Sequence, residues 1–521
     1  MKINVKNTFN VELPADKDRE NDRRQVLEAC FSYVNPKKTK APELIHVSDE
    51  MLNELGISKE DSLSTNFIEI FSGNKVYPES KPYAMCYGGH QFGNWAGQLG
   101  DGRAINLFEI NHNDKQWAVQ LKGAGETPYS RSADGLAVLR SSIREYLCSE
   151  AMYHLEVPTT RALSLCQSGD QVLRDILYNG NPAYEKGAIV CRVAPSFIRF
   201  GNFEIQSARK NHILLKTLTD YTIKHFFPKI TSTGKDKYLE FFKVVCNKTI
   251  DMIIHWQRVG FVHGVMNTDN MSILGLTIDY GPYGWLEGYD HTWTPNTTDA
   301  QQRRYRFGNQ MYIGLWNLFK LANAIYPLIE ETKSLQNILD SYNDLYEERY
   351  VNMMRKKLGF EMALEEDNKI INKLEIALQL IETDMTIFFR NLGLVNKEFK
   401  ASEAIEIIKD AFYSFTDFKN QVKQEWIAWL ELYLKRLKKE EISNKRKLQN
   451  MNLVNPKYVF RNYMAQLAID SAEVGDYQLI EEFYMMLKKP YNEQPEFQKW
   501  FSKRPDWARN MVGCSMLSCS S

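Results

Sequence analysis

The chain has 521 residues, of which 44% are hydrophobic and 25% charged, and its 65 basic and 65 acidic side chains give a formal net charge of zero. This length allows two or more domains with separate cores, and the composition is typical of a soluble globular protein. A neutral chain has no overall field that attracts nucleic acid or an anionic membrane, so neither is expected as a partner.

The first residues, Met1-Lys2-Ile3-Asn4-Val5, lack the apolar run of a secretory signal, and the acidic residues after them do not suit a transit peptide. No uninterrupted apolar stretch is long enough to span a bilayer. We therefore expect the protein in the cytoplasm.

Six cysteines are scattered singly, which predicts neither a disulfide framework nor a structural zinc site. Cys514 and Cys519 lie together at the end of the chain. Two interpretations remain open for them: a loose tail with two thiols, or a mobile redox tail, because exposed thiols oxidise readily.

The first half of the chain reads as strand-rich. Residues 1–60 mix short helical patterns with polar loops, and Arg24–Phe31 is predicted as a short helix. A glycine-rich stretch follows from Gly88 to Gly102. Strands are then predicted at 104–110, 117–122, 171–173 and 188–193, with a turn at 111–114 and a helix at 139–153.

From about residue 205 the pattern is mainly helical. One helix is predicted over Tyr238–Val259, ending before Gly260, and residues 310–450 are nearly all compatible with helix. The charged run Glu441–Lys447 indicates a solvated helical face or a linker. A last helical segment, Pro456–Lys488, leads into the tail.

The glycine-rich loop and the segment after it contain the first candidate site residues. Gly100 and Gly102 would let backbone N–H groups approach phosphates, and Arg103 adds a charged fork; a plain turn is the alternative. Lys122 ends the next hairpin, and Glu145 follows on the predicted helix. This order predicts a phosphate-contacting lysine paired with a glutamate, against the alternative of two unrelated surface charges.

Two further pairs of residues allow both a structural and a functional interpretation. Asp134-Gly135 precedes the predicted helix, where an ordinary N-cap and turn is the favoured interpretation. Arg192 and Arg199 lie among apolar residues, where unpaired charges are costly. They are either structural salt-bridge partners or forks for phosphate oxygens.

The stretch His263–Asn270, followed by Asp279-Tyr280-Gly281, is similar to a protein kinase catalytic loop followed by D-F-G. Asn270 and Asp279 offer an amide oxygen and a carboxylate, which suit Mg²⁺ held against nucleotide phosphates. Val265 occupies the place of the kinase base and cannot take a proton. Asp269 is the nearest carboxylate that could replace it; a loop-capping role is its alternative.

These elements predict an α+β chain with a protein kinase-like two-lobed fold. The expected divisions are an N-terminal extension packing on the N-lobe, a strand-rich N-lobe, a mainly helical C-lobe, and a C-terminal helical extension with a cysteine-containing tail. Their boundaries are 1–85, 86–204, 205–450 and 451–521.

Several long strings carry a more specific resemblance that runs nearly end to end. They are Asn7–Pro14, Tyr87–Gly93, Gln120–Arg131, Arg192–Gly201, His263–Met271 and Asp279–Pro282. With these strings the chain resembles the selenoprotein O family of protein adenylyltransferases, an atypical branch of the protein kinase-like superfamily.

The resemblance implies transfer of AMP from ATP to Ser, Thr or Tyr hydroxyls of proteins, with UTP as an alternative donor and ATP flipped relative to kinases. It implies Mg²⁺, or Mn²⁺, on Asn270 and Asp279, and Asp269 as the proton acceptor. Glu145 would pair with Lys122. The implied nucleotide contacts are Gly100, Gly102, Arg103, Lys122, Asp134, Gly135, Arg192, Arg199 and Asp279.

Attack at the α-phosphorus would bring the hydroxyl from another direction, so the base need not occupy position 265. The alternatives are a kinase that uses Asp269 as base, and a catalytically inactive ATP-binding scaffold. Some members of the family end in selenocysteine and two serines, and Cys519 stands at that place. Some relatives are regulated by a disulfide between the tail and the activation loop. The corresponding segment here, Tyr280–Phe307, contains no cysteine, which argues against that pairing and leaves another partner thiol as the alternative.

Overall fold

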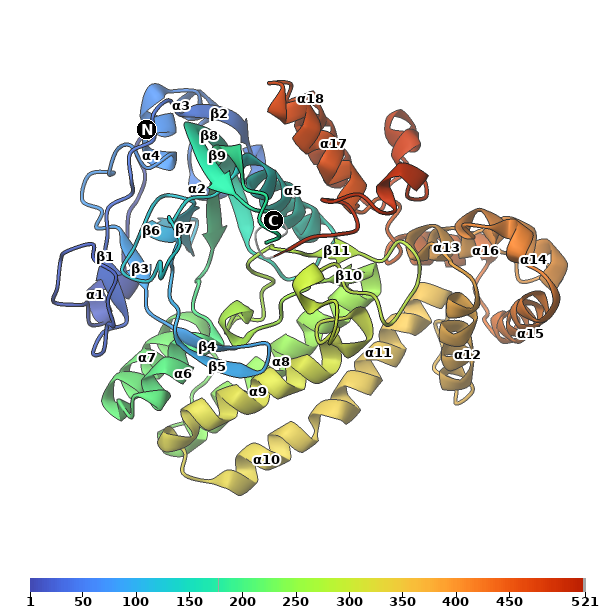
Figure 1. Cartoon of the computed structure of the whole chain (residues 1–521). Coiled ribbons are helices and arrows are strands. Elements are labelled where there is room, and N and C mark those ends of the chain that lie inside the picture. The colour runs from blue at the N-terminus through green and yellow to red at the C-terminus, as the bar shows by residue number, and fades with distance from the viewer. Residues whose placement is uncertain (177, 519–521) are drawn as a thin grey trace.

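The computed structural model describes residues 1–176 and 178–518, so Cys519 lies outside the described residues. It is a mixed α/β structure with an antiparallel sheet and many helices (Figure 1). The main sheet has seven strands in the order β1-β3-β6-β7-β9-β8-β2. The strands are β1 (Phe31–Tyr33), β2 (Glu43–Val47), β3 (Tyr83–Met85), β4 (Gly88–Gln91), β5 (Asn94–Gln98), β6 (Ala104–His112), β7 (Lys115–Lys122), β8 (Arg161–Arg174), β9 (Ala183–Ala194), β10 (Phe261–Val262) and β11 (Gly284–Trp285).

Most helices lie in the second half of the chain. One helix of the first half, α5 (Leu139–His154), packs against β8 and β9 of the main sheet. The helices are α1 (Phe9–Glu12), α2 (Asp49–Leu55), α3 (Lys59–Ser62), α4 (Thr65–Phe71), α5 (Leu139–His154), α6 (Phe200–Ala208), α7 (His212–Phe226), α8 (Gly234–Val259), α9 (Gln310–Ile325), α10 (Thr332–Asp340), α11 (Tyr342–Leu358), α12 (Asp367–Leu380), α13 (Met385–Leu392), α14 (Ala401–Ile408), α15 (Asn420–Leu437), α16 (Asn444–Asn452), α17 (Asn462–Glu473) and α18 (Gln478–Leu487).

The predicted hairpin is confirmed as β6 and β7. Asn113 and Asp114 form its turn with φ angles of 49° and 59°, as a tight two-residue hairpin requires. The register pairs Ala104 with Lys122, so Lys122 lies opposite the residue that follows the glycine-rich loop. The other two predicted strands are parts of β8 and β9, which pair antiparallel.

The predicted helix at Arg24–Phe31 is wrong. Phe31 begins β1, and the residues before it form an irregular segment held by other bonds. The Arg24 guanidinium donates to the Asp16 carboxylate at 2.7 Å, and the Val26 N–H donates to Gln98 Oε1 at 2.8 Å. The second bond satisfies a backbone N–H that a local helix would otherwise have paired.

Residues 1–85 contribute three strands to the main sheet, because β1 pairs with β3, β3 with β6, and β2 with β8. Residues on both sides of position 85 therefore share one sheet. The four divisions expected from the sequence stay a prediction about domain organisation.

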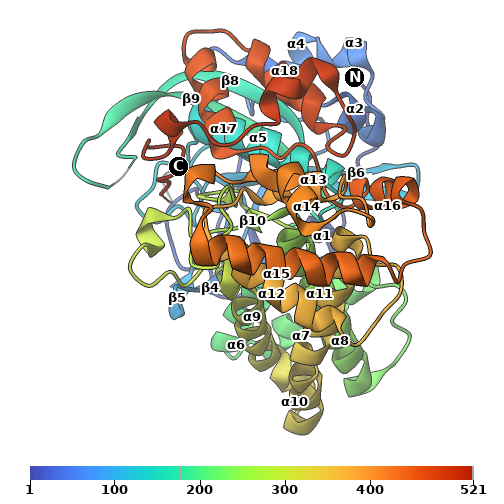
Figure 2. The same ribbon diagram turned by 90° about the vertical axis from the view of Figure 1, so that its right-hand side faces the viewer.

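The predicted helices at 139–153 and 238–259 are confirmed as α5 and α8. The charged run at 441–447 divides between an irregular segment and the start of α16, whose N-cap is Ser443. The last helical segment consists of α17 and α18, and Gly475 between them has a φ of 86°. Both helices pack against α5 (Figure 2).

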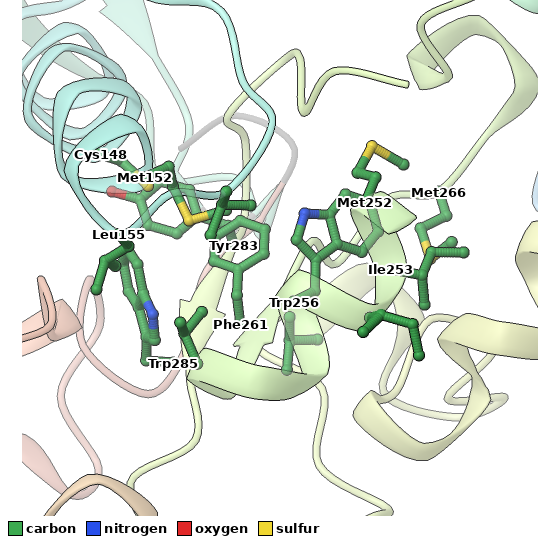
Figure 3. Close-up of a cluster of buried hydrophobic side chains, with 14 of the residues drawn as sticks. Cys148, Met152, Leu155, Met252, Ile253, Trp256, Phe261, Met266, Tyr283 and Trp285 are labelled. Carbon is green, nitrogen blue, oxygen red and sulfur yellow. The ribbon is translucent and has the colours of Figure 1, made fainter. Parts of the chain in front are cut away.

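An aromatic core joins α5 to the loops after α8. Phe261 of β10 lies 5.2 Å from Trp285 and 5.8 Å from Trp256 between ring centroids. Figure 3 shows Cys148 and Met152 of α5 beside these rings and Tyr283. Because the loop that begins at residue 263 follows β10 directly, this core fixes its position relative to α5.

The described residues, 1–176 and 178–518, include no helix with both the length and the apolar character needed to cross a bilayer.

Gly260 ends α8 in the left-handed conformation, with a φ of 76°. Gly260→Ala should lower the free energy of unfolding by about 1–2 kcal/mol, because a side chain disfavours this conformation. The added Cβ would also lie 2.7 Å from Met385 Sδ. Urea unfolding measures the change.

Gly475→Ala is the matched control, since Gly475 is also left-handed but has nothing within 4 Å of an added Cβ. It should show the conformational cost alone, and Gly260→Ala should cost more. Unfolding midpoints equal to that of the unchanged protein would contradict this account.

Candidate active site

A pocket of about 680 Å³ is lined by the glycine-rich loop, β7, β9 and the loops after β10. This volume is in the range of small-molecule and cofactor sites. Every residue expected to contact nucleotide, metal or proton lines it: Gly100, Gly102, Arg103, Lys122, Asp134, Gly135, Arg192, Arg199, Asp269, Asn270 and Asp279. Glu145 is buried on α5 and reaches the lysine of the pocket.

Lys122 and Glu145 form a buried ion pair. Lys122 Nζ lies 2.5 Å from Glu145 Oε2, and the other carboxylate oxygen lies 3.1 Å from Arg192 Nη1. Burial lowers the pKa of Lys122. The charge of Glu145 raises this pKa, and the charges of Arg103 and Arg192 lower it further. Glu145 thus holds two cations at one wall of the pocket.

Asp279 lies between two buried arginines. Arg192 Nη1 is 2.7 Å from Asp279 Oδ1, and Arg199 Nη1 contacts Oδ2. Burial alone would raise the pKa of Asp279, but the charges of Arg199, Arg192 and Lys122 outweigh it and hold this pKa well below its usual range. The arginines therefore form salt bridges and also line the pocket.

Asn270 ends the 3₁₀ turn Thr268–Asn270, and its side chain is oriented by Val265. The Asn270 Nδ2 donates to the Val265 carbonyl at 2.9 Å. This bond uses one of the two N–H groups and fixes the orientation of the amide, whose oxygen is the atom that can bind a cation. Position 265 therefore has a structural role that does not depend on its side chain.

Asp269 points its carboxylate toward the β4 strand. Gln91 Nε2 donates to Asp269 Oδ2 at 3.2 Å, and Oδ1 is buried without a hydrogen-bond partner among the described residues. Burial raises the pKa of Asp269 to about 6, against the opposing effects of Gln91 and Arg199. Such a carboxylate is suited to accept a proton near neutral pH.

The favoured interpretation of Asp134 as an N-cap is wrong. The N-cap of α5 is Val138, which makes no side-chain cap bond. Asp134 instead forms an ion pair with Arg174 at 2.8 Å and accepts from the Leu136 N–H at 3.0 Å. Its carboxylate orders the loop before the helix at the edge of the pocket.

Sequence reasoning missed Asp101, which is 1% exposed. Its Oδ2 accepts from the Met85 N–H at 3.0 Å and from Asn106 Nδ2 at 3.2 Å. Arg199 Nη2 lies 3.8 Å from Oδ1. Asp101 thus ties the glycine-rich loop to the sheet, and its place between two glycines was the available signal.

Sequence reasoning also missed the bonds between the β4–β5 hairpin and the loop that begins at residue 263. The His90 N–H donates to Thr268 Oγ1 at 2.7 Å, and the Phe92 N–H donates to Asn267 Oδ1 at 3.2 Å. The Tyr305 hydroxyl donates to the same Asn267 oxygen at 2.5 Å. Three segments far apart in the sequence therefore meet beside Asp269.

Comparisons with known proteins identify the family. The family described as "Protein adenylyltransferase SelO" matches residues 17–488. The chain belongs to this family. "Protein nucleotidyltransferase YdiU" of Flavobacterium johnsoniae is 63% identical over 519 residues, which cover 100% of this chain and 99% of the relative. Proteins of the same name from Aromatoleum aromaticum and Rhodopirellula baltica are 52% and 50% identical, over 99% of this chain and 99% and 98% of theirs.

The described residues of this SelO family member contain no group of three or more His, Cys, Asp or Glu side chains that could hold a metal by themselves. A metal that arrives with a nucleotide needs fewer protein ligands, since phosphates and water complete its shell. The Asn270 amide oxygen and the Asp279 carboxylate fit that requirement, because both line the pocket and both are hard oxygen donors.

Proposed function

We propose that this chain transfers AMP from ATP to Ser, Thr or Tyr hydroxyls of proteins, with release of pyrophosphate, and uses UTP as a second donor. The observation that carries the proposal is the set of cations and oxygen ligands in one pocket. Lys122, Arg192 and Arg199 surround Asp279 there, beside Asn270. Family membership supports the same activity.

The proposed fold is that of a protein kinase, with the sheet and α5 in one lobe and the helices from α6 onward in the other. The Lys122–Glu145 pair supports this, because kinases place such a pair between a strand and the following helix. Gly100, Gly102, Arg103, Asp134 and Gly135 would hold the nucleotide at the edge formed by the glycine-rich loop.

In the proposed reaction, the acceptor oxygen forms a bond to the α-phosphorus while the bond to the pyrophosphate oxygen breaks. Asp269 would take the hydroxyl proton. Lys122 and the two arginines would neutralise the negative charge that the phosphates carry. A Mg²⁺ or Mn²⁺ ion on Asn270 and Asp279 would supply Lewis-acid stabilisation of phosphate oxygens.

ATP labelled at the α or at the γ phosphate tests the proposal. Label should reach protein only from the α position, because the β- and γ-phosphates leave together. Label that arrives only from the γ position would show a kinase instead. Parallel reactions with labelled UTP, and with Mg²⁺ or Mn²⁺ alone, measure the preferred donor and ion.

Asp269→Asn should reduce the turnover number for transfer about a hundredfold, because it removes the proposed base. Asparagine keeps the shape and can still bond to Gln91, so the fold and the KM for ATP should change little. Initial rates at saturating ATP measure the effect. Unchanged turnover would remove Asp269 from the mechanism.

Gln91→Leu is the control for Asp269→Asn, because it removes the contact and leaves the carboxylate in place. If both variants lost activity to the same extent, positioning of the loop rather than proton transfer would explain the Asp269 result.

A further inference from the structure

Residues 300–329 carry a strong local charge in a chain that is neutral overall. They contain Arg303, Arg304, Arg306 and Lys320, and no Asp or Glu. Among residues 1–176 and 178–518, no carboxylate lies within ion-pair distance of these four cations. The nearby Asp299 carboxylate is buried and accepts backbone N–H groups of Arg304 and Tyr305 at 2.9 and 2.7 Å.

Two of these four cations lie over an aromatic ring. The Arg304 Cζ lies 4.6 Å from the Trp316 ring centroid, and the Lys320 Nζ lies 4.7 Å from the same centroid. His90 links Trp316 to Trp95, at 5.4 and 5.1 Å between centroids. We call Trp95, Arg304, Trp316, Phe319 and Lys320 the basic–aromatic face.

The face is partly open to solvent: Arg304, Trp316 and Lys320 are half-buried, and the other two large apolar side chains are exposed. Trp95 is 41% exposed and Phe319 is 45% exposed. Arg304 Nε is buried without a hydrogen-bond partner among the described residues, so only the terminal NH₂ groups of this guanidinium can serve an outside carboxylate. The combination of unpaired cations and exposed rings is typical of a binding surface rather than of a solvated helix face.

The face adjoins the side of the pocket on which Asp269 lies. Trp95 belongs to β5, and the hairpin partner of β5 is β4, which carries Gln91. Gln91 lines the pocket and donates a hydrogen bond to Asp269. Tyr305, next to Arg304, bonds to Asn267 of the catalytic loop. Figure 1 shows the β4–β5 hairpin beside α6 and close to α9, the helix that carries Trp316 and Lys320.

We propose that the basic–aromatic face binds an acidic segment of the acceptor protein, next to the hydroxyl that is modified. The proposal rests on the proposed function, since it names the class of protein that this pocket would modify. Charge complementarity selects the occupant: Arg304 and Lys320 form no salt bridge within the described residues, and Asp and Glu side chains of a partner would supply that counter-charge. The exposed rings would cover the apolar parts of the same segment.

Binding of short fluorescent peptides to the full chain tests the face without requiring activity. The probes are an Asp/Glu-rich peptide, the same peptide with Asn and Gln in their place, and a single-stranded oligonucleotide. The acidic peptide should bind at least roughly tenfold more tightly than its amide counterpart, and added salt should weaken its binding. Equal affinity for the two peptides, or tighter binding of the oligonucleotide, would overturn the proposal.

Lys320→Glu should weaken binding of the acidic peptide by roughly tenfold. Lys373→Glu is the matched control: Lys373 is an exposed lysine of α12, and the change in charge is the same. Arg304→Gln should act in the same direction as Lys320→Glu. An effect of Lys373→Glu as large as that of Lys320→Glu would show general charge repulsion and contradict a local site.

Transfer assays separate this proposal from the proposed function. With Ser- or Thr-containing acceptor peptides, Lys320→Glu should raise the KM for an acidic peptide and leave turnover and the KM for ATP unchanged. If no variant transferred label from α-labelled ATP but the acidic peptide still bound at the face, the proposed function would fail, and the face would stand as a binding site for acidic segments. If peptides with and without acidic residues beside the acceptor hydroxyl were modified equally well, the inference would be overturned and the proposed function would remain.

Discussion

Asp279→Asn is expected to reduce nucleotidyl transfer about a thousandfold, because it removes a carboxylate that would hold the metal against the phosphates. Asparagine has nearly the same shape, so the pocket should keep its form. The charge of the site changes much more: Arg192 and Arg199 both contact this carboxylate. Without it, two buried cations lose their shared counter-ion.

This change in charge gives the experiment a second readout. Loss of the shared carboxylate should destabilise the free protein, because Arg199 then keeps only Asp101, 3.8 Å away, while Arg192 keeps Glu145 at 3.1 Å. A triphosphate should bind without metal to these less compensated arginines of the pocket, and ATP should then raise the thermal midpoint of the variant more than that of the unchanged protein. Thermal unfolding with ATP and a chelator measures this difference.

Asp384→Asn is a useful control, because Asp384 also pairs with a buried arginine, Arg461, at 2.6 Å but lies outside the pocket lining. It should lower stability without rescue by ATP. An Asp279→Asn protein that transfers AMP at the original rate would contradict the metal-ligand assignment. If the unchanged protein and the variant were equally inactive and bound ATP equally well, the inactive scaffold would be the better explanation.

Strong local patterns explain which elements could be predicted. Apolar residues at helical spacing mark α5 and α8, and two strand-like runs around a polar turn mark β6 and β7. The segment Arg24–Phe31 has a helical pattern as well, but Val26 bonds to Gln98, more than 70 residues away. A pattern read within one window cannot include such a partner.

In the site, too, the order of the residues could be predicted from the sequence, whereas contacts between distant segments could not. The order of the glycine-rich loop, Lys122, Glu145, Asn270 and Asp279 is visible in the sequence, and the structure brings these residues together. The hairpin bonds to Asn267 depend on contacts between distant segments and could not be predicted. Val265 shows a further limit of prediction from the sequence. The sequence shows only that the kinase base is missing at this position, whereas the structure shows that the Val265 carbonyl orients the Asn270 side chain.

Lys122→Met should reduce transfer by about a hundredfold to a thousandfold, the effect of removing one preorganised charge from a transition state. The fold should tolerate the change, because Glu145 would keep Arg192 as a partner at 3.1 Å. The methylene stem of methionine fills most of the space of the lysine. Initial rates and thermal unfolding measured on the same preparation test both statements.

Lys115→Met is the matched control, since Lys115 is the first residue of the same strand and forms an exposed ion pair with Glu54 at 2.8 Å. Exposed pairs contribute little, so neither its activity nor its stability should change measurably. Full activity in Lys122→Met would refute the role of this lysine. A large loss of stability would show instead that Glu145 needs both cations, and that Lys122 supports the packing of α5 as much as the chemistry of the pocket.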